Sequence, residues 1–215
     1  MKIVSVNIGL PRQISWQGTR VLTGIFKDPS QGSVVVRTLN LDGDRQADLT
    51  VHGGAEKAVY GYPAEHYGYW RRELPQEEFV WGKFGENLTT EGILEDELCI
   101  GDRLRAGSAI LVATQPRMPC YKLALKFGRE DMIKRFLRSR RSGFYFSVAE
   151  EGEVSAGSPI EIISRDSGRV SVADISRLFL SKESDRELLQ RALQVDALPV
   201  SWKESLAVRA EARGR

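Results

Sequence analysis

The chain has 215 residues, of which 41% are hydrophobic and 28% charged, and these fractions are typical of a soluble globular protein. This length allows one substantial domain and a small second one. The formal net charge is only +2 and basic residues alternate with acidic ones, so we expect no nucleic-acid partner and no membrane partner. No run reaches the ~20 apolar residues of a membrane span, and the start reads as a strand rather than a signal peptide, which indicates a cytoplasmic protein.

The first part of the chain predicts many short strands. Runs rich in Val and Ile, separated by Gly, Pro, Asp and Ser, indicate strands at residues 3–8, 21–26, 33–39, 97–105, 109–114, 144–148 and 159–163. Two helices are expected among them, one over residues 63–73 with Pro63 near its start and one over residues 129–137. This pattern predicts a mostly β, barrel-like domain over residues 1–165.

The last part of the chain predicts three helices. Ser171 to Asp174, Ser184 to Glu187 and Ser201 to Glu204 each fit the capping box that opens a helix, and apolar residues follow at helical spacing. Residues 170–215 therefore form a small three-helix domain in this interpretation. A bundle of that size is marginal alone, so we expect it to pack on the preceding domain or on a second copy of the chain in a homodimer.

The segment from Thr114 to Lys122 carries the clearest chemical signal. Pro116 and Pro119 end an apolar strand, which places Cys120 on a stiff loop at the strand end. Arg117 and Lys122 flank this cysteine and favour its thiolate, the form that acts as nucleophile and metal ligand. The alternative is a buried packing cysteine, which is the role we expect for Cys99.

A second candidate is the turn that starts at His52. Gly53 and Gly54 let the backbone come close to an anion, and either His52 or Lys57 can meet a phosphate. The alternative is a plain turn with an exposed histidine. A zinc site made by His52, His66 and Cys120 is disfavoured, because no close pair has the usual ligand spacing.

Three blocks of the sequence resemble a known family. Residues 115–123 (Gln-Pro-Arg-Met-Pro-Cys-Tyr-Lys-Leu) resemble the cysteine signature of MOSC-domain proteins, the C-terminal domain type of molybdenum-cofactor sulfurases. Residues 51–58 and 84–89 resemble two further blocks of the stand-alone bacterial members of the YiiM type. The resemblance covers nearly the whole chain. It implies a MOSC-type β-barrel domain with a few helices, followed by a small C-terminal three-helix domain.

The resemblance also implies a cofactor and its ligands. It implies binding of molybdenum cofactor (molybdopterin) with Cys120 as the protein ligand to molybdenum, since a soft sulfur suits this metal. Arg117, Lys122, Lys57 and the His52-Gly53-Gly54 turn are the candidates for the cofactor's phosphate. Within the block at 84–89, the Asn87 amide suits the edge of a pterin, and Thr89 suits phosphate oxygens.

The activity implied by the resemblance is reduction of N-hydroxylated compounds, including toxic hydroxylamino base analogues, to amines. An N–OH group becomes N–H with loss of water while molybdenum(IV) becomes molybdenum(VI), and a separate electron-donor protein, a flavin or iron–sulfur reductase, restores the metal. An alternative is a non-catalytic molybdenum-cofactor carrier or a persulfide sulfur carrier at Cys120. A cysteine hydrolase or transferase with His52 or His66 as base ranks last, because no third positioning group is evident.

Overall fold

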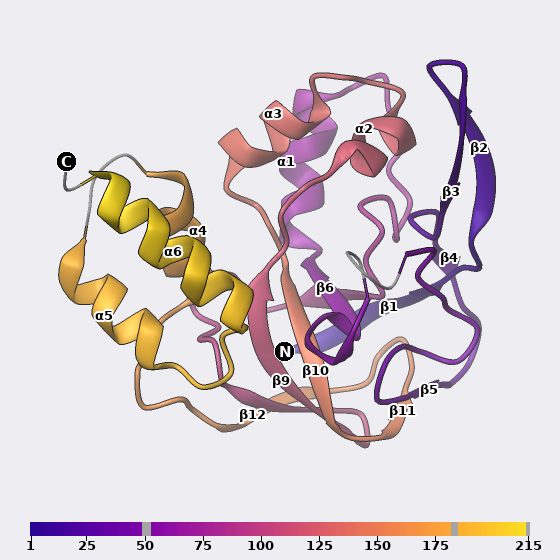
Figure 1. The fold of residues 1–215 in the computed structure, drawn as a ribbon. Helices are drawn as coiled ribbons and strands as arrows, with labels where there is room; N and C mark the ends of the chain where they lie inside the picture. Colours follow the sequence, from indigo (N-terminus) through magenta and orange to yellow (C-terminus); the bar gives the residue numbers. More distant parts are fainter. Residues whose placement is uncertain (49–52, 182–184, 214–215) are drawn as a thin grey trace.

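A mixed sheet of eight strands forms the centre of the part of the chain that the structure describes (Figure 1). The structure is a computed structural model, and it describes residues 1–48, 53–181 and 185–213. Its strands are β1 (Lys2–Ile8), β2 (Arg12–Trp16), β3 (Thr19–Thr23), β4 (Asp28–Pro29), β5 (Val34–Val36), β6 (Val59–Pro63), β7 (Leu88–Glu91), β8 (Arg103–Ala106), β9 (Ala109–Pro116), β10 (Phe144–Glu150), β11 (Gly152–Val154) and β12 (Ile160–Ser164). The large sheet has the order β12-β8-β9-β10-β6-β7-β1-β4, and β5 with β11 and β2 with β3 form two small sheets.

The large sheet curls back on itself. The Ile3 amide donates to the Ser158 carbonyl at 2.9 Å, and the Ile160 amide donates to the Met1 carbonyl at 3.0 Å. These bonds bring the start of β1 beside the start of β12, although the two strands share only an isolated bridge at Lys2. The sheet is therefore barrel-like without being a closed barrel, and the prediction of a mostly β first part is confirmed.

Three helices cover an aromatic cluster on one side of the sheet. These helices are α1 (Glu65–Glu73), α2 (Tyr121–Phe127) and α3 (Met132–Ser139), which lie together in Figure 1. The cluster contains the buried rings of Tyr62, Tyr67, Trp70, Phe84 and Phe136, and the Tyr62 and Phe84 centroids are 4.4 Å apart. Burial of so many large rings is a major source of stability, and it gives α2 a firm base.

The three C-terminal helices pack on the sheet of the same chain. They are α4 (Val172–Leu180), α5 (Arg186–Gln194) and α6 (Val200–Arg213). Ile175, Leu188 and Trp202 belong to one hydrophobic core together with residues of the sheet. The Trp202 indole also donates a hydrogen bond to the Gln115 side chain of β9. These contacts confirm that the helices pack on the preceding domain. No helix within the described ranges is long and apolar enough to cross a membrane.

The start of α4 agrees with the capping box predicted from the sequence, whereas the starts of α5 and α6 differ from the prediction. Ser171 forms the predicted capping box with Asp174 at the start of α4. Helix α5 is capped by Asp185, whose Oδ1 accepts from the Leu188 amide at 3.0 Å, while the predicted Ser184 lies outside the described residues. Helix α6 already begins at Val200, so the prediction of a cap at Ser201 is wrong.

This difference leads to a stability prediction with a matched control. Ser171→Ala removes the side chain that accepts from the Asp174 amide, so we expect the free energy of unfolding to fall by about 1 kcal/mol. Ser201→Ala removes no cap, and we expect its effect to stay within about 0.5 kcal/mol. Urea unfolding monitored by circular dichroism measures both. Equal losses in the two variants would contradict the assignment of the α4 cap.

Other predicted boundaries also shift for identifiable reasons. Helix α1 begins at Glu65 because Pro63 still belongs to β6, where it pairs with Thr90 of β7. The strand expected over residues 97–105 is limited to β8, because the Asp102 carboxylate accepts from the Cys99 amide at 3.0 Å and holds a turn there. Residues 12–16 were not expected to form a strand, yet they pair with β3 in a hairpin that projects from the molecule in Figure 1.

Candidate functional site

Five basic side chains from separate segments line one cavity beside the sheet. We call it the cationic cavity and define it by Lys27, Arg45, Lys57, Tyr60, Asn87, Arg117, Cys120, Lys122 and Tyr145. The connection from β9 to α2 contributes Arg117 and Cys120, and the 3-10 helix η1 (Ala55–Lys57) contributes Lys57. Among the described residues that line it, none is Asp or Glu, so the cavity is suited to an anionic ligand.

Arg117 is the most informative of these cations. Its side chain is only 6% exposed, and its guanidinium lies 4.9 Å from the centroid of the Tyr60 ring. Within the described ranges, its Nη1 atom is buried without a hydrogen-bond partner. Burial alone lowers the pKa of Arg117, but Tyr60, Tyr145 and Cys120 raise it above its ordinary value, so the side chain stays charged. A buried, charged donor with an unused N–H is poised to receive an anion.

Cys120 lies directly before the first turn of α2. Strand β9 continues to Pro116, and Cys120 then has the extended backbone of an N-cap residue, with φ of −121° and ψ of 176°. Its side chain is half-buried, whereas Cys99 is buried in the core as expected. Helix α2 was not predicted, so the loop expected around Cys120 is shorter than the sequence indicated. Lys122, in the same helix, is 8% exposed and lines the cavity with Cys120.

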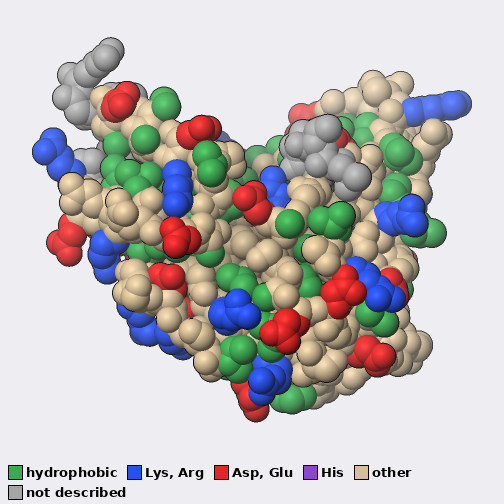
Figure 2. Space-filling view, turned by 60° about the horizontal axis from the view of Figure 1, so that its bottom comes forward, with side chains coloured by type: hydrophobic (Ala, Val, Ile, Leu, Met, Phe, Trp, Pro, Cys, Tyr) green, Lys and Arg blue, Asp and Glu red, His purple; other side chains and the backbone are tan. Residues whose placement is uncertain are grey.

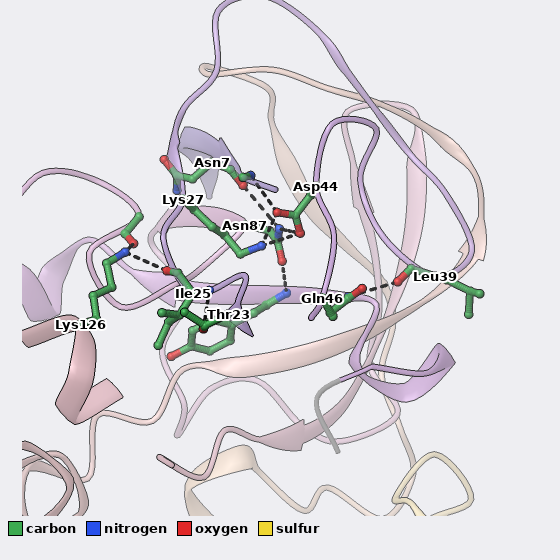
Figure 3. A network of polar contacts seen from close by, with 12 residues as sticks. Asn7, Thr23, Ile25, Lys27, Leu39, Asp44, Gln46, Asn87 and Lys126 are labelled. Carbon is green, nitrogen blue, oxygen red and sulfur yellow. Dashed lines mark hydrogen bonds and ion pairs between the residues drawn. The ribbon is translucent and has the colours of Figure 1, made fainter. Parts of the chain in front are cut away.

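A buried polar network forms one wall of the cavity (Figure 3). Lys27 makes an ion pair with Asp44, whose side chain is fully buried. Burial lowers the pKa of Lys27, while Asp44 acts in the opposite direction. Lys27 donates to both Asp44 oxygens, and Asp44 Oδ2 also accepts from the Asn87 side-chain N–H at 2.9 Å. The Asn87 side-chain oxygen accepts from the Tyr60 backbone N–H at 3.1 Å. The Asn87 side chain therefore lines the cavity and ties its wall together.

Thr89 lies away from the cationic cavity. Its hydroxyl accepts from the Asn7 side chain at 3.1 Å and donates to Glu86 at 3.0 Å, and it is fully buried. The structure thus brings Cys120, Arg117, Lys122, Lys57 and Asn87 to one cavity but leaves Thr89 in the interior beside it.

The glycine turn precedes η1. Gly54 has φ of +97°, which favours glycine, and its carbonyl accepts from the Lys57 amide at 3.0 Å. Gly54 thus positions Lys57, while neither Gly53 nor Gly54 lines the cavity and His52 lies outside the described residues. The Nε2 atom of His66 lies 2.8 Å from Glu95, and His66 does not line the cavity. The structure therefore pairs His66 with Glu95 and not with the cavity that holds Cys120.

Sequence reasoning missed four members of this site. Lys27 and Arg45 come from connections early in the chain, and Tyr60 and Tyr145 face each other from β6 and β10 with centroids 5.1 Å apart. Burial raises the pKa of both phenols, so both remain protonated and neutral. None of these residues lies near Cys120 in the sequence, and only the folded sheet places them together.

Comparisons with known proteins agree on one family. Residues 48–161 match the MOSC domain, and residues 170–211 match the YiiM-like, 3-alpha helix domain. YflK of Bacillus subtilis (strain 168) is 40% identical over 203 residues, covering 94% of this chain and 91% of YflK. Protein YiiM of Escherichia coli (strain K12) is 38% identical over 189 residues, covering 87% and 84% of the two chains. A Gibberella moniliformis protein named reductase is 32% identical over 181 residues, which are 83% of this chain but 32% of that protein.

A solved structure shares the whole architecture. The crystal structure of YiiM from Geobacillus stearothermophilus has a TM-score of 0.80 and 34% identity, covering 97% of this chain and 98% of the other. The fold is that of a MOSC-domain protein, and this chain belongs to that family. Its C-terminal helices and its relatives place it in the YiiM group of the family.

Proposed function

We propose that this protein is a molybdenum-cofactor-dependent oxidoreductase that reduces N-hydroxylated compounds to amines. The observation that carries the proposal is the buried Arg117 with its unpartnered Nη1, which shares one cavity with Cys120. An anionic, sulfur-ligated cofactor needs both features, and the residues present fit it. The relative named reductase supports an oxidoreductase activity for this group.

The residues of the cavity would have two roles, which are to bind the anionic part of the cofactor and to bind its metal. Arg117, Lys122, Lys57 and Arg45 would hold the anionic part of the cofactor through charge-assisted hydrogen bonds. The sulfur of Cys120 would be the protein ligand to the metal, because a thiolate matches a soft metal. When bound, the cofactor supplies the two-electron chemistry of molybdenum between its IV and VI states.

Other residues of the cavity preserve the positive charge of Arg117 and hold the cavity wall in place. Tyr60 and Tyr145 stay neutral, so they do not offset the positive charge of Arg117. The Asp44–Asn87 network fixes the wall from which Tyr60 extends. Conversion of N–OH to N–H with release of water consumes two electrons and two protons. In this proposal a separate flavin or iron–sulfur protein delivers the electrons, and solvent delivers the protons.

Substitution of Arg117 tests the cavity directly. Arg117→Met keeps the length and apolar packing of the side chain but removes the charge, so we expect cofactor affinity to fall by roughly 10- to 100-fold. Stability should hold or rise, because a buried charge is replaced by an apolar group. Pterin fluorescence of the oxidised extract and metal analysis measure the cofactor content.

Arg141 provides the matched control. Its Nε atom is also buried without a partner among the described residues, and its guanidinium lies 3.9 Å over the Tyr69 ring, but it does not line the cavity. Arg141→Met should therefore keep the cofactor. If Arg117→Met retains as much pterin as the parent, Arg117 is not part of the cofactor site. A carrier would hold the cofactor in the same way but show no turnover with an artificial electron donor.

A further inference from the structure

A second hollow opens on the other side of Cys120. We call it the aromatic groove, and the residues that distinguish it from the cationic cavity include Phe179, Ser201, Trp202 and Ser205 of the C-terminal helices. It shares Lys57, Met118, Cys120 and Tyr145 with the lining of the cationic cavity, so the two spaces meet at the cysteine. Figure 2 shows the surface hollowed between the C-terminal helices on the left and the rest of the molecule.

The aromatic wall of this groove is held firmly. Trp202 is 8% exposed, and its indole N–H donates to the Gln115 side chain of β9. The Phe179 and Trp202 centroids are 5.1 Å apart, and the Arg209 guanidinium lies 3.9 Å from the centroid of the Phe179 ring. These contacts join α4, α6 and β9, so the two rings present a fixed surface rather than mobile side chains.

The chemistry of the groove differs from that of the cavity. The groove shares one cation, Lys57, and the Cys120 thiol with the cavity. The rest of its lining offers aromatic rings, prolines and a thioether, and its polar members on α6 are the exposed Ser201 and Ser205. The Gln115 oxygen already accepts from Trp202, and the Ser205 hydroxyl already donates to the Ser201 carbonyl. Such a surface binds the flat face of a ring and leaves the polar ring edge to water. A pterin joined to a phosphate would instead use the cations and polar groups of the cavity.

We propose that the aromatic groove is the subsite for the planar ring of a ring-bearing N-hydroxylated substrate, so that the C-terminal helices set substrate preference. This inference rests on the proposed function, because it requires the reacting N–OH group to lie at Cys120. Phe179 and Trp202 then act as specificity-determining residues. A small hydroxylamine without a ring would not contact these two side chains.

Filling the groove tests the proposal. Ser205→Trp places a large side chain in the groove while keeping the core contacts of α6, and Glu204→Trp places the same side chain on an exposed neighbour that does not line it. The full-length protein, loaded with cofactor, is assayed with a hydroxylaminopurine and with N-methylhydroxylamine. We expect Ser205→Trp to raise KM for the purine by roughly tenfold and to leave KM for N-methylhydroxylamine unchanged. Glu204→Trp should match the parent for both compounds.

Two further readouts separate the possible failures. Calorimetric titration of the hydroxylaminopurine into the protein as purified should show binding to the parent and to Glu204→Trp, with loss of at least about tenfold in affinity for Ser205→Trp. Pterin content should be the same in all three proteins. Loss of pterin in Ser205→Trp, or equal effects on both substrates, would overturn the groove as a substrate subsite. Ring binding by a parent that reduces neither compound would support the groove while contradicting the proposed reductase activity.

Discussion

Cys120→Ala is expected to abolish molybdenum-dependent reduction while leaving the fold intact. Loss of a group that only orients a metal ligand reduces metal affinity or activity by about 10- to 100-fold. Removal of the ligand itself should therefore reduce the reductase activity by more than about 100-fold. The side chain is half-buried and lines the cavity rather than the core, so we expect the free energy of unfolding to change by less than about 1 kcal/mol. Steady-state reduction with an artificial electron donor and urea unfolding measure the two quantities.

The second cysteine supplies the control. Cys99 is 5% exposed and packed in the core, and burial raises the pKa of its thiol, so it remains a neutral packing group. Cys99→Ala should lower stability by about 1–2 kcal/mol through the cavity it leaves, and it should keep its cofactor and its turnover. A Cys120→Ala protein that is grossly unstable, or that turns over like the parent, would contradict the assignment of Cys120 as the metal ligand.

Asp44→Ala is expected to produce the largest loss of stability. The substitution leaves the Lys27 ammonium buried without its counter-ion, and it also removes the acceptor for the Gly9 amide and the Asn87 side chain. Breaking a buried ion pair from one side destabilises a protein by about 3–5 kcal/mol. The midpoint of urea unfolding should fall accordingly, and the wall of the cationic cavity should loosen with it.

Lys27→Met is the informative comparison. Here Asp44 keeps two N–H donors, from Gly9 at 2.9 Å and from Asn87 at 2.9 Å, and Met fills most of the space of the lysine stem. We therefore expect a smaller loss, roughly 1–2 kcal/mol. Equal losses for Asp44→Ala and Lys27→Met would show that the ion pair alone, rather than the network around Asp44, determines the stability of this wall.

The sequence predicted the architecture well because its signals are local. Short runs rich in Val and Ile marked most strands, and the capping box at Ser171 marked the start of α4. Helix α2 was missed because Pro116 and Pro119 indicate a loop, and the helix starts only two residues after the second proline. Strand β3 overlaps the strand predicted over residues 21–26, but β2 and hence the hairpin were missed, because β2 has no buried residue that would mark it in the sequence.

The sequence identified those members of the site that lie in recognisable motifs, including Lys57 and Asn87. Arg117, Cys120 and Lys122 lie within six residues and could be grouped from the sequence, and the structure places them on one cavity. Lys27 and Arg45 reach the same cavity only through the pairing of distant strands, which no local pattern reveals. Asn87 could be singled out as polar and loop-borne, but its bonds to Asp44 and Tyr60 depend on the tertiary fold.

The central claim is that the cationic cavity holds molybdenum cofactor with Cys120 as ligand. Its most direct test is the molybdenum and pterin content of the protein purified under reducing conditions from cells that make the cofactor. We predict near-stoichiometric molybdenum and pterin in the parent, and loss of molybdenum in Cys120→Ala. Absence of both from the parent, while a molybdenum enzyme purified from the same cells is fully loaded, would contradict the claim.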